Sequence, residues 1–131
     1  MPPALRLELL PGRLAVARLD EDAGPPAWAF AAPGLAAVVR RRGEVSVVCA
    51  EASVPAGAQA ERGWRALEVA GPLEFALAGV LAGLAVPLAE AGVSIFALAT
   101  YDTDVLLVRE AQLDAAIAAL RAAGHDVSRA S

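Results

Sequence analysis

Hydrophobic and polar positions in the first half of the chain follow the two-residue period of β-strands. Residues 5–10 (LRLELL) and 14–19 (LAVARL) alternate on either side of a Pro-Gly dipeptide, which predicts a tight hairpin. Residues 35–39 and 45–50 are apolar runs around a charged turn with three arginines, which predicts a second pair of strands. A run of charge at a hairpin end is usually a solvated turn, so we favour that interpretation over an anion site.

The second half of the chain alternates between strand-like and helix-like patterns. Its order is strand, helix, strand, strand, helix, strand, which is the α+β arrangement of ferredoxin-like domains, with antiparallel strands and the helices on one face. The two middle strands and the polar turn between them predict a hairpin with Asp102 and Asp104 at its mouth. The predicted elements are the strand at 64–69, the helix at 73–91, the strands at 93–99 and 105–108, the helix at 110–123 and a short strand at Val127.

The first of these helices is predicted from apolar residues three and four positions apart, which form one stripe. A Gly-Pro dipeptide precedes it, as expected for a helix start, and Pro87 is expected to end or kink it. Gly79 and Gly83 leave room for a neighbouring element to approach closely. The stripe consists of Leu73, Leu77, Val80, Leu81, Leu84 and Leu88.

The connector between the two halves is the segment 54–63, which is rich in proline, glycine and alanine. It divides the chain into predicted domains at residues 1–60 and 61–131. The 131 residues, of which 57% are hydrophobic, are enough for a core in one ordinary domain or in two very small ones.

Composition argues against several classes of function. The net charge of −4 argues against binding to the phosphates of nucleic acid. The chain has no lysine, so a Schiff base and a phosphate-loop lysine are excluded. Its one cysteine, Cys49, cannot form an intramolecular disulfide, and its one histidine, His125, follows a predicted helix, where we expect a structural role. We therefore predict no catalytic residue, no metal site and no cofactor.

The sequence gives no reason to predict a membrane partner. Its most hydrophobic run, residues 75–89, is too short for a membrane span and is interrupted by glycine and proline. The N-terminus lacks the basic start and the long apolar core of a signal peptide. These features predict a cytoplasmic protein.

Several short motifs occur together in one order along most of the chain. They are GEVSVVC at 43–49, VP at 54–55, GWR at 63–65, GPLEF at 71–75 and TYDTD at 100–104. With them, the chain resembles the bacterial ACT-domain proteins that are related to the animal cytosolic arginine sensors. The resemblance implies two ACT-like units in tandem, each ferredoxin-like, with the first unit shortened or rearranged. It also implies interfaces between units or subunits at which amino acids bind.

The residues that would hold a free amino acid are predicted from the chemistry of its two charged groups. Backbone amides at a helix start, from Gly71 onward, would bind the carboxylate, and Asp104 would accept hydrogen bonds from the ammonium group. We expect the turn after the first strand and the turn between the next two strands to lie at opposite ends of the sheet. The predicted site therefore combines two units or two subunits. Its residues are Gly71, Pro72, Leu73, Glu74, Thr100, Tyr101, Asp102, Asp104, Glu44, Ser46 and Val47.

The Glu44 segment enters this set through a weak internal repeat. Residues 38–48 can be aligned with residues 98–108, which places Glu44 opposite Asp104. A simpler interpretation is that the threonines and aspartates only cap the turn and that the Gly-Pro dipeptide only starts a helix. Two carboxylates in one turn would also permit a hard cation, but such carboxylates are usually solvated.

The resemblance implies a non-catalytic protein that binds a small ligand, a free amino acid, and acts as a sensor or regulator. Its expected partners are the amino acid and a second copy of the chain, without nucleic acid or membrane. The alternative is an assembly or partner-binding module with no small-molecule ligand.

Overall fold

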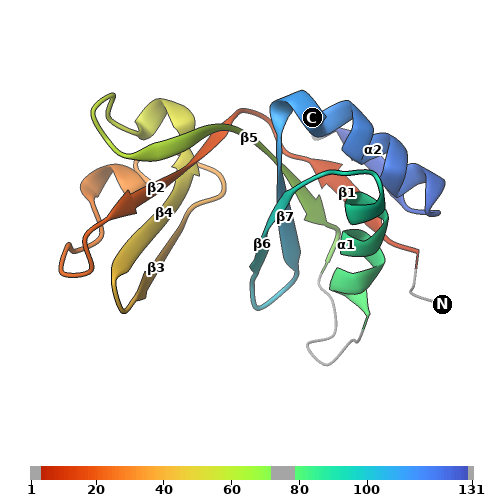
Figure 1. Cartoon of the computed structure of the whole chain (residues 1–131), viewed down its shortest axis with the longest axis horizontal. Coiled ribbons are helices and arrows are strands. Elements are labelled where there is room, and N and C mark those ends of the chain that lie inside the picture. Colours follow the sequence, from red (N-terminus) through yellow and green to blue (C-terminus); the bar gives the residue numbers. More distant parts are fainter. Residues whose placement is uncertain (1–3, 72–78, 130–131) are drawn as a thin grey trace. The chain divides into compact units, whose positions relative to one another are not determined.

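The structure is a computed structural model that describes residues 4–71 and 79–129 (Figure 1). It is a mixed α+β fold in which most strand pairs are antiparallel, as the sequence predicts. The described part of the chain holds eight strands and two α-helices, which belong to two compact units. We call them the helical unit, Met1–Pro11 with Arg65–Ser131, and the β unit, Gly12–Trp64.

The helical unit confirms the predicted order of elements. Its elements are β1 (Arg6–Leu9), the second half of β5 (Ala60–Val69), α1 (Val80–Glu90), β6 (Ile95–Ala99), β7 (Asp104–Arg109), the 3-10 helix η3 (Glu110–Gln112), α2 (Leu113–Ala122) and β8 (Asp126–Arg129). From β5 onward the order is strand, helix, strand, strand, helix, strand. The strands lie in the order β6-β7-β5-β1-β8, so β1 is inserted between the first and the last strand of the ferredoxin-like arrangement.

The predicted hairpin of residues 5–10 with residues 14–19 is wrong. β1 instead pairs antiparallel with β5, where Leu7 faces Val69, and parallel with β8, where Leu7 faces Val127. Both predicted segments are strands, but each pairs with its own part of β5, which is ten residues long. The Pro-Gly dipeptide between them therefore connects two strands that are not partners.

The division into residues 1–60 and 61–131 is corrected for the same reason. Because β1 pairs with β5 and β8, the first eleven residues belong to the helical unit together with the C-terminal half. The other boundary falls inside β5, between Trp64 and Arg65, close to the connector that the sequence indicates.

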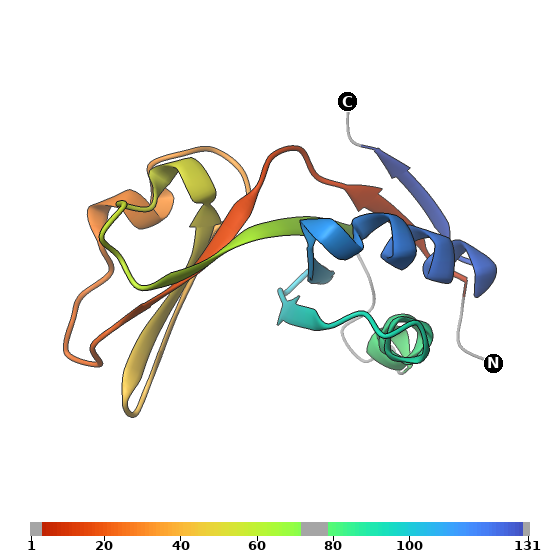
Figure 2. The same cartoon turned by 45° about the horizontal axis from the view of Figure 1, so that its top comes forward.

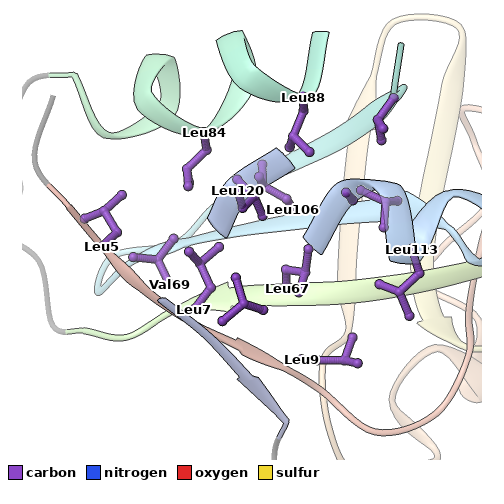
Figure 3. Close-up of a cluster of buried hydrophobic side chains, with 14 of the residues drawn as sticks. Leu5, Leu7, Leu9, Leu67, Val69, Leu84, Leu88, Leu106, Leu113 and Leu120 are labelled. Carbon is purple, nitrogen blue, oxygen red and sulfur yellow. The ribbon is translucent and has the colours of Figure 1, made fainter. Parts of the chain in front are cut away.

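The core of the helical unit lies between one face of its strands and the two helices (Figure 3). Leu84 and Leu88 of α1 and Leu120 of α2 point toward the strands, so both helices cover the same face. Burying each such leucine contributes roughly 1.5–3 kcal/mol. The cluster consists of Leu5, Leu7, Leu9, Leu67, Val69, Val80, Leu84, Leu88, Val93, Leu106, Val108, Leu113, Ala116, Leu120 and Val127.

The apolar stripe predicted on the first helix is confirmed in part. Leu81 is 46% exposed, so its assignment to the core is wrong. It lies about 100° around the helix from Val80, at the edge of the stripe. Leu73 and Leu77 lie outside the described residues. The buried members are Val80, Leu84 and Leu88.

Pro87 lies inside α1, which continues to Glu90, so the prediction that it ends the helix is wrong. A proline has no N–H for the carbonyl four residues earlier, here that of Gly83. Nε2 of the buried His125 lies 2.9 Å from this carbonyl oxygen, and the N–H of Leu5 donates to Nδ1 at 3.0 Å. Because Nδ1 is the acceptor, Nε2 carries the proton and donates to Gly83. His125 therefore replaces the hydrogen bond that Pro87 removes.

The β unit is built from short antiparallel strands around a small core. It contains β2 (Leu14–Leu19), the 3-10 helix η1 (Ala27–Phe30), β3 (Ala37–Arg41), β4 (Glu44–Ala50), the 3-10 helix η2 (Glu51–Ser53) and the first part of β5. The strand order is β3-β4-β2-β5, and β3 with β4 confirms the second predicted hairpin. Its core side chains are Ala15, Ala17, Ala29, Val45, Val47, Cys49 and Val54.

The His125 contacts predict a coupling with Pro87. The substitution His125→Ala leaves the buried Leu5 N–H and the Gly83 carbonyl without their partner, which should lower the free energy of unfolding by about 2–4 kcal/mol. In a Pro87→Ala background the loss should be about 1 kcal/mol smaller, because an alanine restores the N–H that reaches Gly83. Urea denaturation of the four proteins measures this coupling. Equal losses of unfolding free energy in both backgrounds would show that His125 does not replace the hydrogen bond that Pro87 removes.

The β-unit core predicts an unreactive thiol. Burial raises the pKa of Cys49, so less thiolate is present near neutral pH than for an exposed cysteine. Alkylation by iodoacetamide should be slow in buffer and fast in denaturing urea, as followed by mass spectrometry. Equal rates in the two solvents would show that this core is open.

Candidate functional site

The turn between β6 and β7 is closed by its two threonines. The backbone N–H of Thr100 donates to the carbonyl of Thr103 at 2.7 Å, and the Thr100 hydroxyl donates to the same carbonyl at 2.9 Å. The Thr103 N–H donates to the Thr100 hydroxyl at 3.1 Å. This arrangement is the side-chain turn that threonines three residues apart favour, and it confirms that these residues cap the turn.

A further hydrogen bond ties this turn to β5. The Thr103 hydroxyl donates to the carbonyl of Val69, the last residue of β5, at 2.8 Å. Gly71 follows Val69 by two positions in the chain. The turn and the end of β5 therefore lie at the same end of the helical unit's strands. The expectation that they lie at opposite ends is wrong, so residues of a single unit can face both ends of a ligand.

The two carboxylates of the turn differ in their surroundings. Asp104 is the first residue of β7, pairs with Ala99 and is half-buried, whereas Asp102 is exposed. Within residues 4–71 and 79–129, no hydrogen bond or ion pair of either carboxylate is found. Tyr101 extends into solvent with 85% of its surface exposed. Asp104 is thus the carboxylate that a rigid strand positions.

Three predicted site residues lie in the β unit. The side chains of two of them already interact with other residues of that unit. The Glu44 carboxylate accepts a hydrogen bond from Nε of Arg41 at 3.0 Å and lies 3.6 Å from Nε of Arg18. The side chain of Val47 is buried in the β-unit core. Ser46 is half-buried on β4 between its strand partners. The turn residues Thr100 to Asp104, in contrast, belong to the helical unit.

Of the remaining predicted site residues, only one belongs to the part of the chain that the structure describes. Gly71 is described and exposed, whereas Pro72, Leu73 and Glu74 lie outside the described residues. Thr103 is absent from the predicted ligand set, although its hydroxyl sets the position of the turn. No local pattern indicates this role, because the hydroxyl of Thr103 bonds to a residue 34 positions earlier in the chain.

The described residues contain neither a cluster of metal ligands nor a membrane-spanning helix. In residues 4–71 and 79–129, no group of three or more His, Cys, Asp or Glu side chains is placed to hold a metal ion. None of the helices in these ranges has the length and the hydrophobicity needed to cross a bilayer.

Comparison with known proteins gives one family model and several solved structures. The model described as ACT domain matches residues 59–122. Protein Atu0741 from Agobacterium tumefaciens is 32% identical, with 98% of this chain and 96% of that chain covered and a TM-score of 0.92. Protein VC0802 from Vibrio cholerae, of unknown function and described as a possible transport protein, is 21% identical, with 92% and 90% covered and a TM-score of 0.73. No curated protein matches the sequence significantly.

A third similar structure is the ligand-free regulatory subunit of aspartate kinase from Thermus thermophilus. It is 16% identical, with 93% of this chain and 99% of that chain covered and a TM-score of 0.62. At this identity the likeness shows the fold alone. The segment matched as ACT domain runs from the start of β5 to the end of α2, so it includes α1 and the β6–β7 turn.

The link between the turn and β5 can be tested by two matched substitutions. Thr103→Val keeps the shape of the side chain but removes the hydroxyl, and should lower the free energy of unfolding by about 1–3 kcal/mol because the Val69 carbonyl loses its donor. Thr103→Ser retains the hydroxyl and should cost less. Chemical denaturation measures both values, and an equal cost would mean that the hydrogen bond contributes nothing.

Proposed function

We propose that this chain, which belongs to the same family as Atu0741 and carries an ACT domain at residues 59–122, is a non-catalytic regulator that binds a free amino acid. The observation that carries the proposal is the hydrogen bond from Thr103 to Val69, which ties the turn before Asp104 to the end of β5, two positions before Gly71. The likeness in fold to a regulatory subunit of aspartate kinase supports the regulatory part of the proposal.

The proposed contacts match the two charged groups of an amino acid. The Asp104 carboxylate accepts charge-assisted hydrogen bonds from the ammonium group, and such bonds are roughly twice as strong as neutral ones. The exposed backbone N–H of Gly71, two positions after the end of β5, would donate a hydrogen bond to the carboxylate. Tyr101 and Asp102, which are exposed beside Asp104, would contact the side chain of the ligand.

The choice of amino acids as ligands rests on the motifs. TYDTD at 100–104 and GPLEF at 71–75 resemble those of proteins related to the animal cytosolic arginine sensors, so arginine is the first ligand to test. We propose that the protein acts in the cytoplasm and that ligand binding changes its association with a second copy or another partner. The proposal assigns no catalytic residue and no cofactor.

One observation favours the alternative of a pure assembly module. α1 carries no charged residue before Glu90, and its outer side exposes Leu81 and Val86, the latter to 55%. A helix that is apolar all round is usually covered on all sides. This surface would suit a homodimer with or without a ligand, so dimer formation alone does not separate the two functions.

A thermal-shift screen with the twenty amino acids tests the proposal. One amino acid should raise the Tm selectively, because a ligand at 100 times its Kd stabilises the folded state by about 2.7 kcal/mol. Asp104→Asn should abolish the rise, since it removes the charge with little change of shape. Asp102→Asn is the matched control and should retain most of it.

Two other outcomes would contradict the amino-acid ligand or the assignment of its site. No rise with any amino acid, combined with a stable dimer in analytical ultracentrifugation, would favour the assembly module. A rise that Asp104→Asn leaves unchanged, in a variant with unaltered circular dichroism, would keep the function and contradict the site.

A further inference from the structure

The helix α2 and the strand β8 are neighbours in the helical unit (Figure 2). Their side chains line a hollow of about 240 Å³. It shares no residue with the β6–β7 turn. Its strand side comes from Leu9 of β1 and from the last three residues of β8, where Leu9 pairs with Arg129. The lining residues are Leu9, Asp114, Ile117, Ala118, Arg121, Val127, Ser128 and Arg129.

The hollow has an apolar floor. Leu9 and Val127 belong to the core face of their strands, and Ile117 packs against the same cluster from α2. The helix contributes Asp114, Ile117, Ala118 and Arg121, whose spacing of three and four places them on one side of α2. An aliphatic group would therefore contact side chains from both the helix and the strands.

Two arginines line the hollow beside this apolar floor. Residues two apart on a strand share a face, so Arg129 lies on the same face as Val127, above the core and not on the opposite side of the strands. Arg121 donates from Nη2 to the carbonyl of Val127 at 2.7 Å, which holds its guanidinium over β8. In residues 4–71 and 79–129, neither arginine forms an ion pair.

From this arrangement we propose a second binding site, for a small aliphatic monocarboxylate. Arg121 and Arg129 bind the carboxylate, for which the forked donors of arginine are suited. The apolar floor of Leu9, Ile117 and Val127 binds the tail. Asp114, which also lines the hollow, repels a second carboxylate, so the site selects monocarboxylates over dicarboxylates.

The ligand is a small one, because the hollow measures about 240 Å³. A branched acid such as 4-methylpentanoate has a short aliphatic tail and one carboxylate, which match the apolar floor and the two arginines. Affinity for so small a molecule should be modest, with a Kd on the order of 1 mM.

The test is a titration of the full chain, labelled with ¹⁵N, with 4-methylpentanoate, followed by amide shifts. The amides around residues 127–129 and 117–121 should shift, and 4-methylpentylamine, which has the same tail and the opposite charge, should shift them at least about tenfold less at equal concentration. Arg129→Gln should raise the Kd about tenfold, because it removes one charged donor. Asp104→Asn should leave this Kd unchanged, which separates the site from the amino-acid site.

A steric variant with a matched control completes the experiment. Ala118→Leu fills the hollow without changing a charge and should raise the Kd at least about tenfold. Ala115→Leu adds the same group at an exposed position of α2 outside the hollow and should not affect binding. Equal effects of the two variants, or equal binding of acid and amine, would overturn the proposal.

A purely structural role for Arg129 makes a different prediction. Charged side chains that point inward on edge strands can prevent sheets from joining edge to edge. If Arg129 acts only in this way, no amide shifts with the acid up to about 20 mM, and Arg129→Gln promotes self-association in ultracentrifugation. That result would also overturn the proposal.

Discussion

The fold inside each unit depends on one strand, β5, because it pairs with strands of both. Its first half pairs with β2, where Trp64 faces Leu14, and its second half pairs with β1, where Val69 faces Leu7. β7 is a further partner of β5. The last carbonyl of β5 then accepts the hydrogen bond from Thr103, which ties the β6–β7 turn to the end of β5. Strand pairing therefore brings the residues of this turn and the end of β5 together within one unit.

His125 supplies a comparable constraint for the helices. A proline inside α1 leaves the Gly83 carbonyl without its helical donor. The imidazole of His125 bridges from this carbonyl to the backbone of Leu5. One neutral side chain thus connects α1, the turn before β8 and the residue that leads into β1. A solitary histidine in a sequence is here a structural bridge between segments far apart in the chain.

Local patterns in the sequence predict most elements of this fold because hydrophobic periodicity reports which residues face the core. The β6–β7 hairpin, both helices and the β3–β4 hairpin follow from it. The pairing between strands that are distant in the chain does not follow from hydrophobic periodicity. Residues 5–10 and 14–19 have the same alternation, yet each pairs with its own part of the ten-residue strand β5. Likewise, nothing near Pro87 indicates that a histidine about 40 positions later replaces its hydrogen bond.

For the candidate site, too, the sequence predicts contacts between residues close in the chain and does not predict contacts between distant ones. Turn chemistry predicts that Thr100 caps the polar turn between the two strands, and its hydrogen bonds to the Thr103 backbone confirm this part. The place of the turn beside the end of β5 depends on the antiparallel order of the strands, and local patterns in the sequence do not report that order. Glu44 resembles Asp104 in a weak repeat, yet it already pairs with Arg41.

The most direct measurement is of amide shifts of the ¹⁵N-labelled chain during titration with the amino acid that stabilises it most. If the ligand binds where β5 ends beside the β6–β7 turn, as we propose, the largest shifts fall on Gly71 and on residues 100–104. Shifts confined to residues 44–47, or to any other part of the chain, would contradict it.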